Sequence, residues 1–292
     1  MPKNPLRFGL SLDPDVAHAN DSARLASAAE EAGLDYLAVQ DHPYQAGHLD
    51  SWTWLTHLAG QTRRIGFMTD VADMQLRPPA MLAKAALTFN RLHHGRLALG
   101  VGGGAFADGI AAMGGTRRGN RDMVTYTEEA LQVLQPALAG DFVRLHGAQH
   151  RIEGYQAGPA AAVPVPVWLG AQGPRMLAVT GGYADGWISP LNIYVKPDEV
   201  PAKQKIIDEA ARAAGRDPAT IRRVYNVIGM IGPARGVPGL SGGVEQWADT
   251  LADWSTRLGF DTFIFWPVAE SQSQLELFAG EVVPAVRERV AR

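Results

Sequence analysis

The chain repeats one unit eight times: a short apolar run rich in β-branched residues, a turn rich in Gly, Asp or Pro, and an alanine-rich amphipathic stretch. Runs that are apolar throughout are typical of parallel strands covered on both faces. Eight such strand–helix units predict an α/β protein, and eight parallel strands can close into a (β/α)8 TIM barrel. The predicted strands are 8–12, 36–40, 64–69, 96–102, 166–170, 186–189, 223–230 and 262–266.

The amphipathic stretches between these runs are predicted to be helices. Asp21-Ser22 is a suitable N-cap for the first helix and Gly33 a suitable end, while Pro78-Pro79 can open a later one. Segment 142–158 fits no strand–helix unit, so we expect a small insertion between the fourth and fifth strands, with a hairpin pairing 143–145 with 150–152. No boundary divides the chain, so residues 1–292 are expected to form one TIM-barrel domain. The predicted helices are 21–33, 52–58, 78–92, 120–138, 197–214, 244–258 and 273–290.

An open, doubly wound sheet is the alternative architecture. That fold prefers a glycine fingerprint after its first strand, and Ser11-Leu12-Asp13-Pro14 does not supply one. The net charge of −3 argues against nucleic acid or a membrane surface as partner, and no run of 18 apolar residues predicts a membrane span. The absence of cysteine excludes disulfides and thiolate catalysis, and the histidines show no His-Glu-x-x-His spacing of the kind that binds a metal. A cytoplasmic protein that acts on a small molecule, without a metal, is expected.

Polar residues follow the second and third predicted strands, at the end of a barrel where active sites lie. His42 is the best acid–base candidate, because histidine titrates near neutral pH, and Asp41 can orient it or bond to a cofactor. The alternative is that Asp41 caps a turn and His42 is an ordinary polar residue. Thr69 and Asp70 can contact the edge of a planar cofactor, or they simply end the strand.

Glycines follow the fourth and fifth strands. The run that contains Gly102 and Gly103 lets the backbone approach a flat ring or a phosphate, although a flexible turn is the alternative. After the fifth strand, Gly173 and Pro174 open a helix whose free amides can bind an anion. Arg175 can reinforce a phosphate site there or point into solvent. Four tryptophans are expected to wall an apolar pocket or to pack in the core: Trp52, Trp54, Trp187 and Trp266.

Four stretches resemble the luciferase-like monooxygenase superfamily, and the resemblance covers nearly the whole chain in the right order. The stretch after the fifth strand is the most specific. Within the superfamily the chain is most similar to the branch that uses the deazaflavin coenzyme F420, with an FMN-using branch as the close competitor. The matching stretches are Asp41-His42-Pro43, Leu99-Gly100-Val101-Gly102, Leu169-Gly170-Ala171-Gln172-Gly173-Pro174-Arg175-Met176-Leu177 and Ala184-Asp185-Gly186-Trp187.

The resemblance implies roles for individual positions. Asp41 would contact the polar edge of the deazaflavin ring, and His42 would lie near the reacting carbon. Thr69 and Asp70 match a bulge of the third strand in which the family often has a cis peptide between non-proline residues. Gly102 and Gly103 would lie near the ring or tail of the coenzyme. The residues implied to receive its phosphate are Gly170, Gln172, Gly173 and Arg175.

One position departs from the family pattern. The sugar-phosphate dehydrogenases of the F420 branch carry a glutamate proton donor after the fourth strand, and the matching position here is Ala105, which argues against that activity. The resemblance implies an F420-dependent oxidoreductase, expected to be a homodimer. The alternatives are an FMN-dependent monooxygenase of the same fold and a non-catalytic barrel that only binds the coenzyme.

Overall fold

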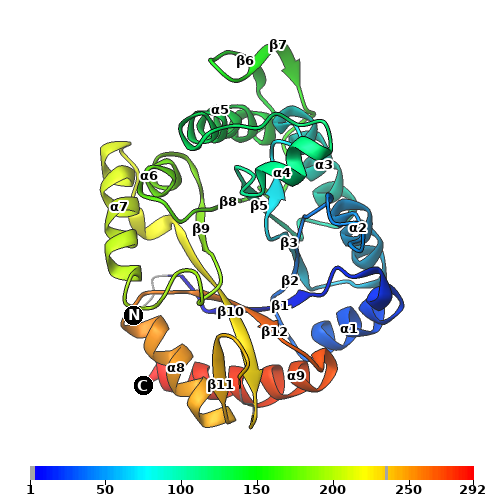
Figure 1. Ribbon diagram of the computed structural model, residues 1–292, viewed down its shortest axis with the longest axis vertical. Coiled ribbons are helices and arrows are strands. Elements are labelled where there is room, and N and C mark those ends of the chain that lie inside the picture. The colour runs from blue at the N-terminus through cyan, green and yellow to red at the C-terminus, as the bar shows by residue number, and fades with distance from the viewer. Residues whose placement is uncertain (1–3, 234–235) are drawn as a thin grey trace.

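A computed structural model describes residues 4–233 and 236–292 and confirms the TIM barrel. Eight parallel strands close into a ring in the order β10-β12-β1-β2-β3-β5-β8-β9, and β9 pairs with β10 to complete it (Figure 1). The strands of the ring are β1 (Arg7–Leu12), β2 (Tyr36–Val39), β3 (Gly66–Thr69), β5 (Leu97–Gly102), β8 (Val167–Gly170), β9 (Gly186–Ser189), β10 (Arg222–Ile231) and β12 (Thr262–Pro267). They match the eight predicted strands to within two residues at each end.

Helices surround the ring (Figure 1), and none within the described ranges is both long and apolar enough to cross a membrane. The helices are α1 (Ala19–Glu31), α2 (Ser51–Gln61), α3 (Pro79–Leu92), α4 (Ala107–Ala112), α5 (Asn120–Leu138), α6 (Pro174–Tyr183), α7 (Val200–Ala213), α8 (Val244–Thr256), α9 (Ser271–Leu277) and α10 (Val283–Ala291). Short 3-10 turns occupy Val16–His18 and Pro218–Thr220.

The predicted helices end within three residues of the observed ones, but two of them differ from the prediction in detail. The first helix begins at Ala19 because a 3-10 turn leads into it, so Ser22 is not the N-cap. Its hydroxyl instead donates to the Ala19 carbonyl and accepts from Trp54 Nε1. The C-terminal helix is not continuous, since a π-helical turn at Phe278–Val282 separates α9 from α10.

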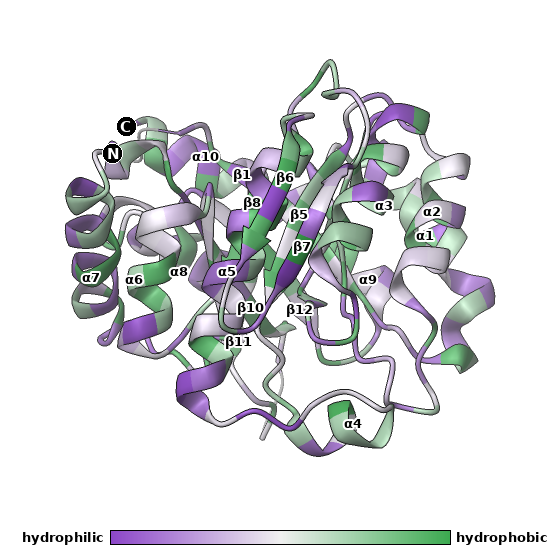
Figure 2. Cartoon of the chain, turned by 90° about the horizontal axis from the view of Figure 1, so that it is seen from above, coloured by the Kyte–Doolittle hydropathy of each residue, from purple (hydrophilic) through white to green (hydrophobic). Residues whose placement is uncertain are grey.

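The insertion between β5 and β8 contains the predicted hairpin, formed by β6 (Phe142–His146) and β7 (Arg151–Gln156). The second strand begins after His150 and is longer than expected. The reason is the Glu129 carboxylate, which accepts hydrogen bonds from the amides of residues 148–150 and holds them in the turn. The structure adds three short elements that the sequence did not reveal: α4, β4 (Ala72–Asp73) and β11 (Leu240–Gly242). Figure 2 shows α4 set apart from the other helices, beyond the carboxyl ends of the strands.

The inside of the barrel is filled by one apolar cluster, which includes Met68, Trp168, Val224 and Ile264. Their neighbours along each strand face outward, where a larger core packs against the helices. Trp187 belongs to that outer core, stacked 5.8 Å from Phe260, so it does not wall a pocket in the barrel. Because the interior is packed, a ligand must bind above the cluster, at an end of the strands.

Candidate functional site

The two glycine segments predicted to hold a coenzyme lie side by side. β5 pairs with β8 in register, with Val101 opposite Leu169. The strands are parallel, so Gly102-Gly103 and Gly170 to Gly173 emerge at the same end of the barrel. The placement agrees with one binding region at the carboxyl ends of the strands.

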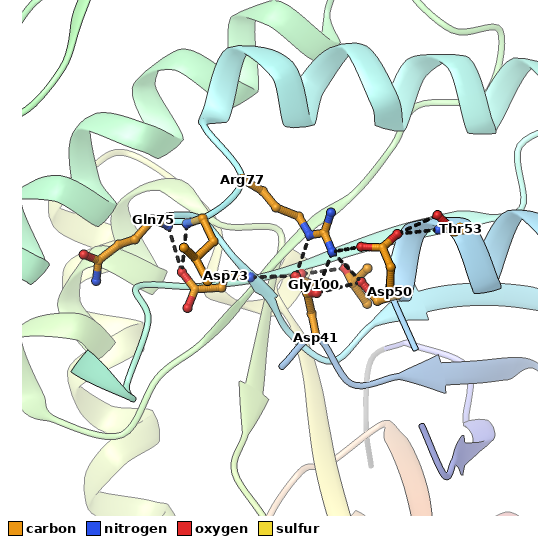
Figure 3. Close-up of polar contacts among 10 residues, drawn as sticks. Asp41, Asp50, Thr53, Asp73, Gln75, Arg77 and Gly100 are labelled. Carbon is orange, nitrogen blue, oxygen red and sulfur yellow. Dashed lines mark hydrogen bonds and ion pairs between the residues drawn. The ribbon is translucent and has the colours of Figure 1, made fainter. Parts of the chain in front are cut away.

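Asp41 follows β2 and is buried, with 2% of its surface exposed. Its oxygens accept two hydrogen bonds from Arg77, at 2.7 and 2.8 Å, one from the Ser51 hydroxyl and one from the Asp73 amide (Figure 3). A carboxylate has about four lone-pair positions, and all are used here. Asp41 is therefore built to hold the site together, and its contact with a coenzyme ring stays a prediction.

A second series of hydrogen bonds holds the glycine loop after β5 in place. The Asp73 carboxylate accepts from the Gln75 amide at 2.8 Å, and the Gln75 side chain donates to the Gly103 carbonyl at 2.6 Å (Figure 3 shows the Asp73–Gln75 contact). Arg118 donates to the Gln75 side-chain oxygen at 2.7 Å. A Cβ on Gly103 would lie 2.6 Å from the Thr127 hydroxyl, so this glycine also makes room for α5. The loop is therefore held by its surroundings and is not a flexible turn.

His42 is half-buried in a row of aromatic side chains. Its ring stacks on Tyr44 at 5.3 Å, and Tyr44 contacts Phe106 at 5.2 Å, while His48 lies 6.2 Å from His42. Burial lowers the pKa of His42, His48 lowers it further, and Asp41 opposes both effects. With its pKa below the usual value, the imidazole is mainly neutral at pH 7 and can accept a proton, which it can then return, as the predicted acid–base role requires.

The end of β3 forms the predicted bulge. The peptide between Asp70 and Val71 is cis. The Thr69 hydroxyl donates to the Gly100 carbonyl at 2.6 Å, which ties β3 to β5. A Cβ on Gly102 would lie 2.6 Å from the Val71 side chain, and one on Gly170 would lie 3.2 Å from it. These glycines therefore accommodate the bulge, whatever else they bind.

Asp70 itself points across the barrel. Its Oδ1 accepts a hydrogen bond of 3.0 Å from Asn226 Nδ2 on β10. Four buried polar atoms in this region have no protein partner: Asp70 Oδ2, Asn226 Oδ1, Ser11 Oγ and Trp266 Nε1. We call these four residues the polar floor. Buried polar groups are nearly always hydrogen-bonded, so the polar floor is shaped to meet a ligand or ordered water.

The N-terminus of α6 carries the residues predicted to receive a phosphate. Gln172, Gly173 and Arg175 are all exposed, and no protein atom lies within 4 Å of the position of a Gly173 Cβ. No side chain caps the helix at Gly173. Lys203 of α7 donates to the Gln172 carbonyl at 3.1 Å and adds a positive charge. Free amides and a cation together favour an anion.

Sequence reasoning missed several of these residues. Arg77, Ser51 and Gln75 lie in segments with no distinguishing pattern, and only the folded chain brings them to Asp41 and Gly103. Asn226 carried a usable signal. It is a polar residue within an apolar strand, at the same parity as the inward-facing Val224.

Comparison with known proteins places this site in a family. Residues 5–235 match the family model described as luciferase-like monooxygenase. An F420-dependent glucose-6-phosphate dehydrogenase of Nakamurella multipartita is 29% identical over 63% of this chain and 56% of its own length. A 5,10-methylenetetrahydromethanopterin reductase of Methanolobus tindarius is 33% identical over 68% of this chain and 58% of its own length. The chain thus matches less than two thirds of either relative.

A solved structure gives the same result for the fold. An F420-dependent secondary alcohol dehydrogenase in complex with an F420–acetone adduct superposes with a TM-score of 0.87, at 18% identity, over 97% of this chain and 100% of that one. A riboflavin lyase with modified FMN and riboflavin superposes with a TM-score of 0.82, at 15% identity, over 98% and 92%. With the family match covering most of its length, the chain belongs to the luciferase-like monooxygenase family.

Proposed function

We propose that this protein is an oxidoreductase that binds the deazaflavin coenzyme F420 and transfers a hydride between it and a small organic substrate. The observation that carries the proposal is the grouping of an uncapped helix N-terminus, a fixed glycine loop and an unpartnered polar floor at one end of the barrel. The F420-dependent glucose-6-phosphate dehydrogenase of Nakamurella multipartita, named above as a relative, supports the choice of coenzyme.

The chain fits the phosphorylated part of such a coenzyme. The amides that follow Gly173 would hold the phosphate, with Gln172 and Arg175 beside them and Lys203 supplying charge. Gly170 would leave room for the sugar-like chain. This binding would depend mainly on backbone amides at the start of a helix, which the helix holds in a fixed orientation.

The chain also fits a flat polar ring. Gly102 and Gly103 would lie along the ring, and Thr69 and Asp70 would line the bulge of β3 beside it. Asp41, through its ion pair with Arg77, would keep the loops around the ring in place. The coenzyme, when bound, supplies a carbon that accepts or gives a hydride. His42 would lie near the reacting atoms and move a proton, and the aromatic row beside it would exclude water.

Direct binding tests the proposal. Purified protein is titrated with F420 and, separately, with FMN, while tryptophan fluorescence is recorded. We expect saturable quenching by F420 with a dissociation constant at least about tenfold lower than for FMN, a difference of about 1.4 kcal/mol. Tighter binding of FMN would instead support a monooxygenase, for which the family description is the favouring observation.

The remaining alternative is a barrel that binds the coenzyme without chemistry. It predicts tight F420 binding and no change in coenzyme absorbance with any substrate of a broad panel. Sugar phosphates are expected to be poor substrates, because Ala105 stands where the resemblance implies a glutamate donor. The presence of His42 and Asp70 at the site favours an active enzyme.

We further propose a homodimer in the cytoplasm. Several large apolar side chains are exposed on α3 and near the hairpin: Met81 at 64%, Leu92 at 62%, Phe142 at 66% and Val163 at 49%. A contact between subunits that covers these side chains would remove their apolar surface from water. Light scattering should give twice the monomer mass, and Phe142→Glu combined with Met81→Glu should shift it to the monomer value.

A further inference from the structure

Asp70 and Asn226 bridge the full width of the barrel. From β3, the ring runs through β5, β8 and β9 to β10 in one direction and through β2, β1 and β12 to β10 in the other. The two strands are therefore opposite each other, and the 3.0 Å hydrogen bond joins them across the centre. Met68 and Val224, two residues earlier on the same strands, belong to the apolar interior. The pair consequently separates that interior from the open end of the barrel.

Three of the four unpartnered atoms of the polar floor belong to neighbouring strands. Ser11, Trp266 and Asn226 lie on β1, β12 and β10, which are consecutive in the ring. β1 stands opposite β8, the strand that leads to the N-terminus of α6. A coenzyme anchored by its phosphate at α6 would therefore extend toward the polar floor, and a substrate would lie next to it.

We infer that Asp70 is a further acid–base residue besides His42, and that it is Asp70 that exchanges a proton with the oxygen of an alcohol or carbonyl substrate, an assignment that rests on the proposed F420-dependent function. In the oxidative direction the alcohol carbon loses a hydride to the coenzyme, and the hydroxyl proton passes to the Asp70 carboxylate. In the reductive direction the carbonyl carbon receives the hydride, and the Asp70 carboxyl returns the proton to the oxygen. Electrons and protons balance in both directions.

The surroundings of Asp70 suit this role. Only 7% of its surface is exposed, and Oδ2 is left without a protein partner. Burial raises the pKa of Asp70 to about 7, while the Asn226 hydrogen bond opposes the rise. The other members of the polar floor do not ionise near neutral pH, and the charge of Asp41 on the neighbouring strand is matched by Arg77. An acid with a pKa near the working pH can both give and take a proton.

The test compares Asp70→Asn with Ser189→Ala. Ser189 also has a buried hydroxyl without a partner, but it shares the outward parity of Trp187 on β9. The variants are titrated with F420 and then assayed with a panel of secondary alcohols and ketones across pH 5 to 9. We expect Asp70→Asn, in which the amide keeps the shape of the side chain, to retain saturable F420 binding and to lose about 100-fold or more in turnover, together with the pH dependence near 7. Ser189→Ala should retain both.

Two further measurements do not depend on the stability of Asp70→Asn or on turnover alone. Infrared spectra of the wild type should contain a carboxylic acid C=O band that disappears as the pH rises through 7 and is missing from Asp70→Asn. Asn226→Ala removes the hydrogen bond that lowers the pKa of Asp70. The pH at which the C=O band disappears and the pH at which activity changes should therefore both rise.

The possible results distinguish failure of the proposed function from failure of the Asp70 assignment. If the wild type does not bind F420, the proposed function fails, and this inference fails with it. If it binds F420 but converts no alcohol or ketone, the substrate class is wrong. If Asp70→Asn keeps the turnover and pH profile of the wild type, or the band does not depend on Asp70, another residue is the acid.

Discussion

Asp41 and Arg77 form a two-point ion pair, with Nε 2.7 Å from one carboxylate oxygen and Nη2 2.8 Å from the other (Figure 3). Arg77 also reaches Asp50 at the start of α2. Burial by itself would lower the pKa of Arg77, but the hydrogen bonds and charges of the two carboxylates raise it. Together with Asp50, the pair thereby connects the end of β2 and the start of α2 with the segment that leads into α3.

Removing Arg77 should destabilise the fold. Asp41 has 1% of its side chain exposed, so Arg77→Met leaves a buried charge without its main partner, at a cost of about 3 kcal/mol in the free energy of unfolding. Urea unfolding measures the change. Arg24→Met is the control, because its pair with Asp21 is exposed and should contribute less than about 1 kcal/mol. Equal losses in the two variants would contradict the structural role of the pair.

Replacing His42 should affect chemistry more than binding. His42→Ala removes a proton-transfer group and should lower turnover about 100-fold, while the F420 dissociation constant changes little. His57→Ala is the matched control, since His57 is exposed on α2. Because burial lowers the pKa of His42, the neutral ring should persist down to mildly acidic pH, and the loss of activity that depends on His42 should begin only below it, separate from the pH dependence near 7 that Asp70 contributes. Unchanged turnover in His42→Ala would remove it from the mechanism.

Introducing a carboxylate at Gly173 should stabilise the fold but weaken the binding of F420. Gly173→Asp fits sterically, because its Cβ position is open, and the added charge should stabilise the N-terminus of α6 by about 0.5 kcal/mol. The same charge would repel a phosphate, so F420 affinity should fall about tenfold or more. Gly243→Asp, at the similarly open N-cap of α8, should stabilise without weakening F420 binding. Equal affinities in the two variants would place the phosphate elsewhere.

Asp70 should make the stability of the fold depend on pH. Its pKa is about 7 in the folded protein and near 3.8 in an unfolded chain, so the folded state holds the proton more strongly. The free energy of unfolding should therefore fall as pH rises from 4 to 7, by up to about 4 kcal/mol. In Asp70→Asn this part of the pH dependence should vanish, as measured by urea unfolding at pH 5 and 8. Identical slopes in both proteins would show that Asp70 has an ordinary pKa.

The strand–helix alternation was sufficient to predict the barrel. Each apolar run, such as Gly186–Ser189, carries its own turn signals, and strand boundaries follow from local chemistry. Errors arose where distant residues intervene. The Glu129 carboxylate, 21 residues before His150 in the sequence, accepts hydrogen bonds from the amides of the hairpin turn and so lengthens it. Trp54 donates to the Ser22 hydroxyl, which therefore does not cap its helix. Neither contact has a local sequence signal.

The alternation of strands and helices, the insertion, and which residues stand where the strands end could be predicted from the amino-acid order, because these features depend on neighbours in the chain. What those residues do became apparent once the barrel had closed around them. Asp41 is saturated by Arg77, whereas Asp70 keeps one oxygen free opposite Asn226, although both follow apolar strands. The difference arises because a closed ring brings strands distant in sequence face to face, and the partner a carboxylate meets depends on which side chain stands across the barrel.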